Sequence, residues 1–159
     1  MRLVTLHSIS KNNLNDFFSN HWGSNQMITS HGVYDCNTLE GFAVLSELDN
    51  IIGLVTYTVE ENCYEIISLD SLEENRGIGT MLLHKVETVA QMANKNKVSL
   101  ITTNDNLHAL LFYQKKGYQI TRVYPNAVEK AREIKPQIPK LSNEGIPIRD
   151  ELLLEKILY

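Results

Sequence analysis

The chain has 159 residues, of which 43% are hydrophobic, and its formal net charge at pH 7 is −4. This length and composition are typical of one globular domain with a sizeable core, and the acidic balance without a block of Lys or Arg argues against a nucleic-acid partner. No signal peptide or membrane-spanning stretch is apparent, and two cysteines without metal-type spacing favour a reducing compartment, so we expect a cytoplasmic protein without a membrane partner.

The hydrophobic pattern predicts strands and helices that alternate along the chain. Strands are expected over residues 3–6, 41–46, 51–59, 64–69, 98–102 and 118–123, and helices from a cap at Ser10 to about residue 21 and over 78–94, 106–116 and 125–133. Residues 27–37 are polar and irregular, which favours a loop or a short strand. The last segment, 152–158, has poor alternation, so its residues alone leave strand and helix open.

The most informative stretch joins the strand 64–69 to the helix that begins at Ile78. It contains Gly77-Ile78-Gly79 followed by Thr80. The two glycines let backbone N–H groups turn outward, and the N–H groups of the first helical turn add partial positive charge at the same place. This arrangement predicts a cradle for an anion, most often phosphate or pyrophosphate, and its alternative is an ordinary glycine-rich turn before a core helix.

Two common nucleotide-binding loops do not match this stretch. A P-loop requires Lys and a hydroxyl residue directly after its second glycine, and no Lys stands there. A dinucleotide fingerprint requires a third glycine at the position that Leu82 occupies. A nucleotide-binding α/β domain is therefore a disfavoured alternative.

A different family matches better. The order strand, short loop, R/Q-x-x-G-x-G/A and long helix resembles the acyl-CoA pyrophosphate loop of the GCN5-related N-acetyltransferase (GNAT) superfamily, and here the loop reads Glu74-Asn75-Arg76-Gly77-Ile78-Gly79. Glu74 departs from the usual Arg or Gln, although backbone contacts to a phosphate would survive this change. Residues 106–118 resemble the family segment N-x-x-A-x-x-F-Y-x-x-x-G-[FY] at every marked position. Residues 104–106 supply good N-cap side chains, and Gly117 suits the end of the same helix.

The resemblance implies one N-acetyltransferase domain over residues 1–159 with an α/β (α+β) fold. Its central sheet would be mixed, mostly antiparallel, with six to seven strands, and helices would flank it. The fourth and fifth strands would splay apart to admit the pantetheine arm of acetyl-CoA. The resemblance also favours a seventh strand at 152–158.

The implied reaction moves an acetyl group from acetyl-CoA to a primary amine by direct attack in a ternary complex, without a metal. Main-chain groups of Ile67 and Leu69 would bind the thioester carbonyl and the pantetheine amides, and Asn106 would contact the pantetheine arm or an ordered water. The residues expected to hold the pyrophosphate are Arg76, Gly77, Ile78, Gly79 and Thr80.

The resemblance implies a general acid, whereas the general base is not fixed by the family's motifs and is assigned from the residues. Tyr113 would be the general acid that gives a proton to the CoA thiolate, because a phenol with a pKa near 10 is a suitable donor; otherwise it is a packed aromatic residue. Glu65 is the candidate general base, since we expect it to share a strand face with Ile67 and Leu69 and an acid on a buried strand is unusual. The alternative for Glu65 is an exposed or salt-bridged side chain.

The sequence leaves the acceptor open among small amines, amino acids, polyamines, antibiotics and protein amino groups. Trp22 and Tyr34 are candidates for an aromatic face that binds a cation, and the net negative charge mildly favours a cationic acceptor. His21 and His108 are further candidates for proton transfer. A non-catalytic acyl-CoA-binding or regulatory domain of the same fold is the alternative function, and a homodimer is one compatible assembly.

Overall fold

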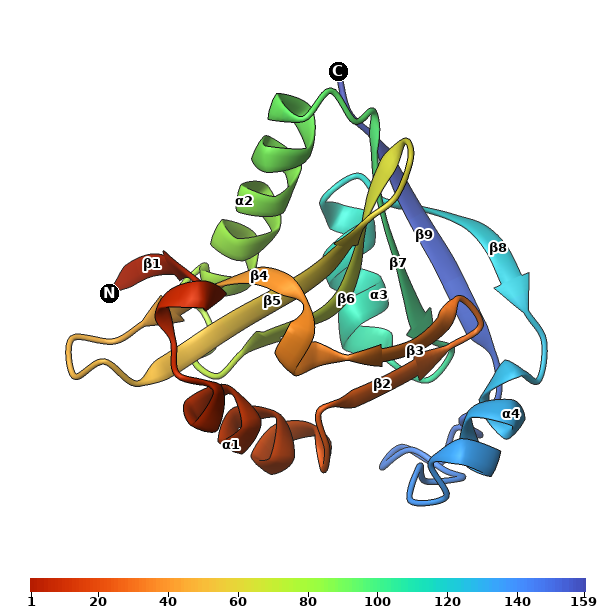
Figure 1. Cartoon of the computed structure of the whole chain (residues 1–159). Helices are drawn as coiled ribbons and strands as arrows, with labels where there is room; N and C mark the ends of the chain where they lie inside the picture. Colours follow the sequence, from red (N-terminus) through yellow and green to blue (C-terminus); the bar gives the residue numbers. More distant parts are fainter. The chain divides into compact units, whose positions relative to one another are not determined.

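The computed structural model describes residues 1–159, which form nine strands, four α-helices and two short 3-10 helices (Figure 1). The elements are, in chain order, β1 (Arg2–Thr5), η1 (Leu6–Ser8), α1 (Lys11–Trp22), β2 (Gln26–Thr29), β3 (Gly32–Asp35), η2 (Cys36–Thr38), β4 (Glu40–Leu45), β5 (Ile51–Val59), β6 (Cys63–Ser71), α2 (Ile78–Met92), β7 (Lys97–Thr103), α3 (Leu107–Lys115), β8 (Gln119–Tyr124), α4 (Ala127–Ile134) and β9 (Glu151–Ile157). None of these helices combines the length and the apolar character needed to span a membrane.

Seven strands form one sheet in the order β1-β4-β5-β6-β7-β9-β8, and β2 and β3 form a separate two-stranded sheet. The predicted α/β fold with a mostly antiparallel sheet and flanking helices is confirmed. The last segment is a strand, β9, as the resemblance implied. Residues 27–37, expected as a loop or a short strand, contain most of β2 and all of β3, two short strands that form a hairpin. The splaying of the fourth and fifth main strands, which are β6 and β7, stays a prediction.

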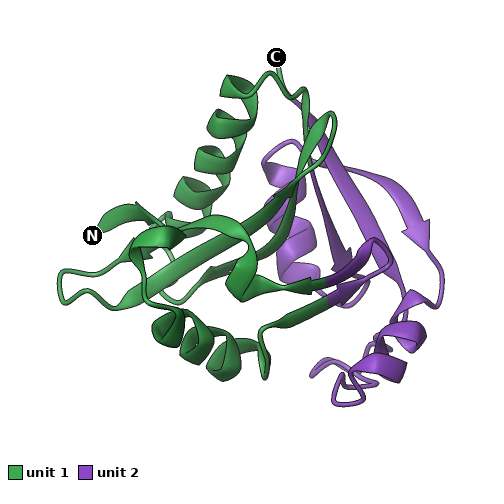
Figure 2. Ribbon diagram, in the orientation of Figure 1, with its two compact units in different colours: residues 1–27, 34–98, 158–159 green, residues 28–33, 99–157 purple.

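The chain divides into two compact units (Figure 2). Unit 1 contains residues 1–27, 34–98 and 158–159, and unit 2 contains residues 28–33 and 99–157.

In unit 1, β1, β4, β5 and β6 are paired antiparallel, each with the next. A β-bulge interrupts the pairing of β5 with β6, because Thr56 lies opposite Ser68 whereas the next residue, Tyr57, lies opposite Ile66. Ile67 is therefore the extra residue of the bulge, and the alternation of side chains along β6 shifts at this point.

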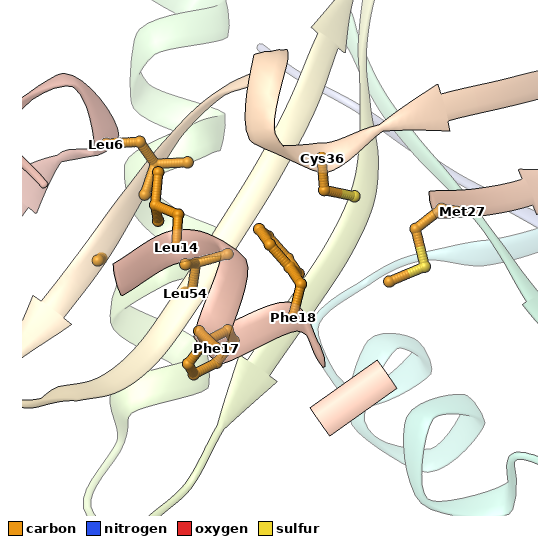
Figure 3. Packing of buried hydrophobic residues seen from close by; sticks show 8 residues of the cluster. Leu6, Leu14, Phe17, Phe18, Met27, Cys36 and Leu54 are labelled. Carbon is orange, nitrogen blue, oxygen red and sulfur yellow. The ribbon is translucent and has the colours of Figure 1, made fainter. Parts of the chain in front are cut away.

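Helix α1 covers one face of this sheet. Its first turn is capped by Ser10, whose hydroxyl oxygen accepts the N–H of Asn13 at 3.2 Å, as expected for an N-cap serine. Figure 3 shows Leu14, Phe17 and Phe18 of α1 in a buried cluster that includes Leu54 of β5. The apolar stripe of α1 thus explains both why the helix forms and where it packs.

Helix α2 covers the opposite face (Figure 1). Gly53 precedes Leu54 in β5, so the two residues point to opposite faces. A Cβ atom on Gly53 would lie 2.3 Å from Cγ2 of Ile78, the first residue of α2, so the start of the helix lies directly against the sheet.

In unit 2, β8 and β9 are paired antiparallel. The segment between α4 and β9 is held by two polar side chains. The Asn104 side-chain oxygen accepts the N–H groups of Arg149 and Asp150, both at 3.0 Å, and its amide donates to the Pro147 carbonyl at 2.9 Å. The Arg132 guanidinium, which is 10% exposed, donates to the carbonyls of the residues Ile138, Pro139 and Ile148.

Candidate functional site

The loop before α2 has the geometry of an anion cradle. Gly77 is the N-cap of α2 with φ +71°, a left-handed conformation that glycine adopts without strain. The first helical bond runs from the N–H of Met81 to the Gly77 carbonyl at 2.9 Å, so the N–H groups of Ile78, Gly79 and Thr80 have no helical acceptor. No side chain caps this helix end, and its first turn has no acidic residue.

The space in front of Gly77 is also open, because a Cβ atom built there meets no atom within 4 Å. Open space, unused amide groups and the positive end of a 15-residue helix occur together at this position. The residues present therefore fit a phosphate or pyrophosphate group, and the binding of such a group stays a prediction.

Arg76, expected to help hold the pyrophosphate, has a carboxylate partner in the structure. Its guanidinium forms an ion pair with Glu73, and both side chains are partly exposed. Arg76 and Glu73 also line a hollow of about 500 Å³ with Ser46 and Asn50 of the turn between β4 and β5. Glu74 is exposed. The Arg76 charge is thus compensated by Glu73, and the remaining positive potential at the loop comes from the backbone N–H groups and the helix dipole.

The bulge in β6 corrects one expectation. Residues directly opposite one another in neighbouring strands have their side chains on the same face, so Glu65, opposite Thr58, shares the α1 face with Ser68, opposite Thr56. Ile67 also packs against the α1 cluster. Leu69 lies opposite Val55, on the α2 face. The prediction that Glu65 shares a face with Ile67 is confirmed, and the prediction that it shares one with Leu69 is wrong, because the bulge reverses the alternation between them.

Glu65 is buried, with 4% of its surface exposed. It lies near Tyr34 of β3, whose pKa is raised to about 12, first by burial and then by the negative charges of Glu65 and Glu60. Tyr34 therefore keeps its proton and presents a hydroxyl group in the environment of the Glu65 carboxylate. The predicted alternative of an exposed Glu65 is wrong.

Sequence reasoning missed a second carboxylate on the same face. Asp70, opposite Leu54, accepts a hydrogen bond of 2.8 Å from the indole N–H of Trp22 at the end of α1. Burial raises the pKa of Asp70, while the Trp22 hydrogen bond and the positive charge of His21 act against this shift. The only available signal was an acidic residue near the end of a buried strand. Nothing in the sequence relates Asp70 to Trp22, which lies 48 positions earlier.

In unit 2, Asn106 is the N-cap of α3. Its side-chain oxygen accepts the N–H of Ala109 at 3.3 Å, and its amide donates to the Thr102 hydroxyl at 3.3 Å. Gly117, at φ +95°, follows the helix end as predicted. The cap is confirmed, whereas a contact of Asn106 with acetyl-CoA stays a prediction.

Tyr113 lies on α3 and is 7% exposed. Its ring centroid is 5.1 Å from that of Phe112 and 5.6 Å from that of Tyr118, and both pairs are edge-to-face. The Tyr113 carbonyl accepts the N–H of Tyr118 at 3.0 Å. These contacts hold the ring in one orientation. His108 is an exposed residue of the same helix, and His21 in unit 1 lies against the Phe17 ring.

The predicted site residues thus form two sets. Unit 1 contains Glu65, the main chain of β6 at Ile67 and Leu69, and the loop 76–80, and unit 2 contains Asn106 and Tyr113. The general-acid role of Tyr113 and the general-base role of Glu65 stay predictions. No group of three or more His, Cys, Asp or Glu side chains is close enough together to hold a metal ion.

Comparisons with known proteins point to one family. The model of the acetyltransferase (GNAT) family matches residues 11–118. The chain is 51% identical to the uncharacterized protein YdhI of Bacillus subtilis over 158 residues, which cover 99% of each chain. It also resembles a GNAT family acetyltransferase from Elizabethkingia anophelis with acetyl-CoA bound (27% identity, 77% and 78% of the two chains, TM-score 0.64). The fold is shared with the IAA acetyltransferase from Bacillus cereus (20% identity, 99% and 100% of the two chains, TM-score 0.70).

Proposed function

Because the chain belongs to the GNAT family of acetyltransferases, we propose that it moves an acetyl group from acetyl-CoA to a primary amine in a ternary complex. The observation that carries this proposal is the start of α2. Three N–H groups without helical acceptors, an uncapped helix end and open space in front of Gly77 suit the pyrophosphate of CoA.

The main chain of β6 has a role in this reaction. The amine nitrogen attacks the thioester carbonyl carbon, and a main-chain N–H of β6 at Ile67 stabilises the negative charge that develops on the oxygen. In other enzymes, the loss of one such hydrogen-bond donor raises the activation free energy by about 3 kcal/mol. The bulge supports this role, because it leaves Ile67 without a residue opposite it in β5.

Two proton transfers complete the reaction. Glu65 accepts the proton that the amine loses, directly or through a water, and its burial on the α1 face supports this assignment. The carbon–sulfur bond breaks, and the Tyr113 hydroxyl gives its proton to the departing thiolate. The contacts of Tyr113 with Phe112 and Tyr118 support a fixed donor. We assign residues 1–159 to one N-acetyltransferase domain.

A non-catalytic acyl-CoA-binding domain is the second candidate. The observation in its favour is the ion pair of Arg76 with Glu73, which leaves the loop without an unpaired cation beside the phosphate site. Such a domain would bind acetyl-CoA and release no thiol in the presence of any amine.

Thermal unfolding with acetyl-CoA, followed by a thiol-release assay with a panel of amines, tests both candidates. At about 100 times its dissociation constant, acetyl-CoA should stabilise the fold by roughly 2.7 kcal/mol, and ATP and NAD serve as controls. Stabilisation with thiol release supports the transferase, and stabilisation without it supports the binding domain. Unchanged stability in millimolar acetyl-CoA would remove both functions.

A further inference from the structure

Asn104 joins the end of β7 to the segment that leads into β9. Its main-chain N–H donates to the Asp150 carbonyl at 3.0 Å, and its side-chain oxygen accepts the N–H groups of Arg149 and Asp150, both at 3.0 Å. Its side-chain amide donates to the Pro147 carbonyl at 2.9 Å. The main chain and both polar atoms of the side chain therefore bind one short stretch, residues 147–150, which uses most of the hydrogen-bonding capacity of an asparagine.

The start of helix α4 fixes the same stretch independently. Asn126, the N-cap of α4, donates its N–H to Oδ1 of Asp150 at 2.8 Å, and the N–H of Val128 donates to the Arg149 carbonyl at 3.0 Å. Val128 is buried, so packing also holds the start of α4. The stretch is therefore a fixed point to which Asn104 attaches the end of β7.

Asn104 also lies in the turn from which α3 begins. The N–H of Asn106 donates to the Thr103 carbonyl at 3.1 Å, and this bond closes a tight turn. Asn104 and Asp105 are the central residues of the turn. Asn106 is the N-cap of α3 and binds the N–H of Ala109. Because Asn104 ties this turn to residues 147–150, it also fixes the place where α3 starts.

The position of α3 depends on its two ends, because little of the helix is buried. Among its nine residues only Tyr113 is buried, whereas Leu107 and Leu111 are 54% and 59% exposed. A helix of this length is not stable on its own, so its contacts and caps must hold it in place. At its far end the Tyr113 carbonyl accepts the N–H of Tyr118, and at its start the turn at Asn104 holds it.

We propose that Asn104 is a positioning residue: by fixing the turn before α3, it holds the Tyr113 hydroxyl where that group gives its proton to the CoA thiolate. The inference rests on the proposed function, because Asn104 would act only through Tyr113. A misplacement of about 1 Å at a catalytic centre can lower a rate about 100-fold, so a small shift of α3 is enough for a large effect.

Steady-state thiol release from acetyl-CoA tests this inference, with butylamine, L-lysine, spermidine and kanamycin as the amines. Asn104→Ala removes the side-chain bonds to residues 147–150, and kcat should fall at least about tenfold. KM for acetyl-CoA should change less than about threefold, because the phosphate loop and β6 are unaltered and the proton is transferred only in the transition state.

Two further variants separate positioning from a general loss of stability. Asn104→Asp keeps an oxygen that accepts the N–H groups of Arg149 and Asp150, so it should restore kcat to within about threefold of wild type. Arg132→Met is the matched control, because it removes the bonds to the carbonyls of residues 138, 139 and 148 and leaves Asn104 unchanged. It should lower the stability and leave kcat within about twofold of wild type. Urea unfolding measures the stability of each variant.

Hydrogen exchange of the amides of residues 107–115, measured without substrates, reports on α3 directly. We expect these amides to exchange at least about tenfold faster in Asn104→Ala and at the wild-type rate in Arg132→Met. Unchanged exchange of α3 in Asn104→Ala would overturn the inference, as would an unchanged kcat or an equal loss of kcat in Arg132→Met. A wild-type protein that releases no thiol with any of these amines would refute the proposed function, and the exchange rates alone then decide whether Asn104 fixes α3.

Discussion

The contact between Gly53 and the start of α2 leads to a prediction about the phosphate loop. In Gly53→Ala, the new Cβ atom would lie 2.3 Å from Cγ2 of Ile78 and 3.1 Å from Cδ1 of Leu82. Ile78 and Leu82 are 1% and 0% exposed, so neither side chain has room to move aside within the core. The helix itself must move away from the sheet.

The size of the effect follows from these distances. Ordinary van der Waals contact begins at 3.4 Å, so Ile78 must shift by about 1 Å. Overpacking of this kind typically costs about 1–3 kcal/mol of stability. Because Ile78 is the first residue of α2, its N–H and those of Gly79 and Thr80 move with it. Loss of one hydrogen bond to a charged phosphate, about 1.5–3 kcal/mol, would weaken acetyl-CoA binding about 10- to 100-fold.

Urea unfolding and calorimetric titration with acetyl-CoA measure both effects. Ile78→Ala removes the clashing Cγ2 atom and on its own should cost about 2–5 kcal/mol of stability. In the double variant Gly53→Ala/Ile78→Ala, the loss of stability should be smaller than the sum of the losses in the two single variants. The coupling energy between the two substitutions should exceed about 1 kcal/mol. Gly23→Ala is the control, because its Cβ meets no atom within 4 Å, and it should combine additively with Ile78→Ala. If the stability losses of Gly53→Ala and Ile78→Ala add to within about 0.5 kcal/mol in the double variant, the steric reasoning is refuted.

Three further predictions follow. Tyr113→Phe should lower the rate of thiol release about 100-fold or more and leave the affinity for acetyl-CoA unchanged. The control Tyr118→Phe alters a neighbouring buried tyrosine and should retain turnover. Equal rates of thiol release in both variants would exclude the acid role of Tyr113. Burial raises the pKa of Asp70 above 3.8, so its contribution to stability is present below pH 3.8 and lost as the pH rises through the raised value. Asp70→Asn should therefore gain stability relative to wild type between pH 3.8 and 7 in urea unfolding, and a difference that does not change with pH would contradict this. Asn104→Ala should cost about 1–3 kcal/mol and expose residues 135–150 to limited proteolysis, and an unchanged cleavage rate would show that its hydrogen bonds do not hold this segment.

The elements with strong local signals were predictable from the sequence. Ser10 and Asn106 cap their helices as expected, and α2 begins at Ile78 directly after the glycine that permits its turn. These features depend on residues within a few positions of one another, so their physical causes are visible in a short window.

Elements whose form depends on distant partners were harder to predict. The hairpin of β2 and β3 has a polar sequence, so no hydrophobic alternation predicted these two strands. The strand β9 begins Glu151-Leu152-Leu153-Leu154, and this run has no period of two. Its pairing with β8 makes it a strand, and only the family resemblance anticipated that result.

The sequence by itself determined the fold class, the family and the phosphate-type loop, because hydrophobic periodicity, helix caps and glycine conformations act locally. The tertiary structure alone decided which face of β6 each side chain occupies, since the bulge at Ile67 arises from the pairing with β5 and reverses the alternation. It also decided that Trp22 meets Asp70, and that Arg76 pairs with Glu73. Such contacts depend on how helices and strands pack in three dimensions, and no residue's position in the chain specifies them.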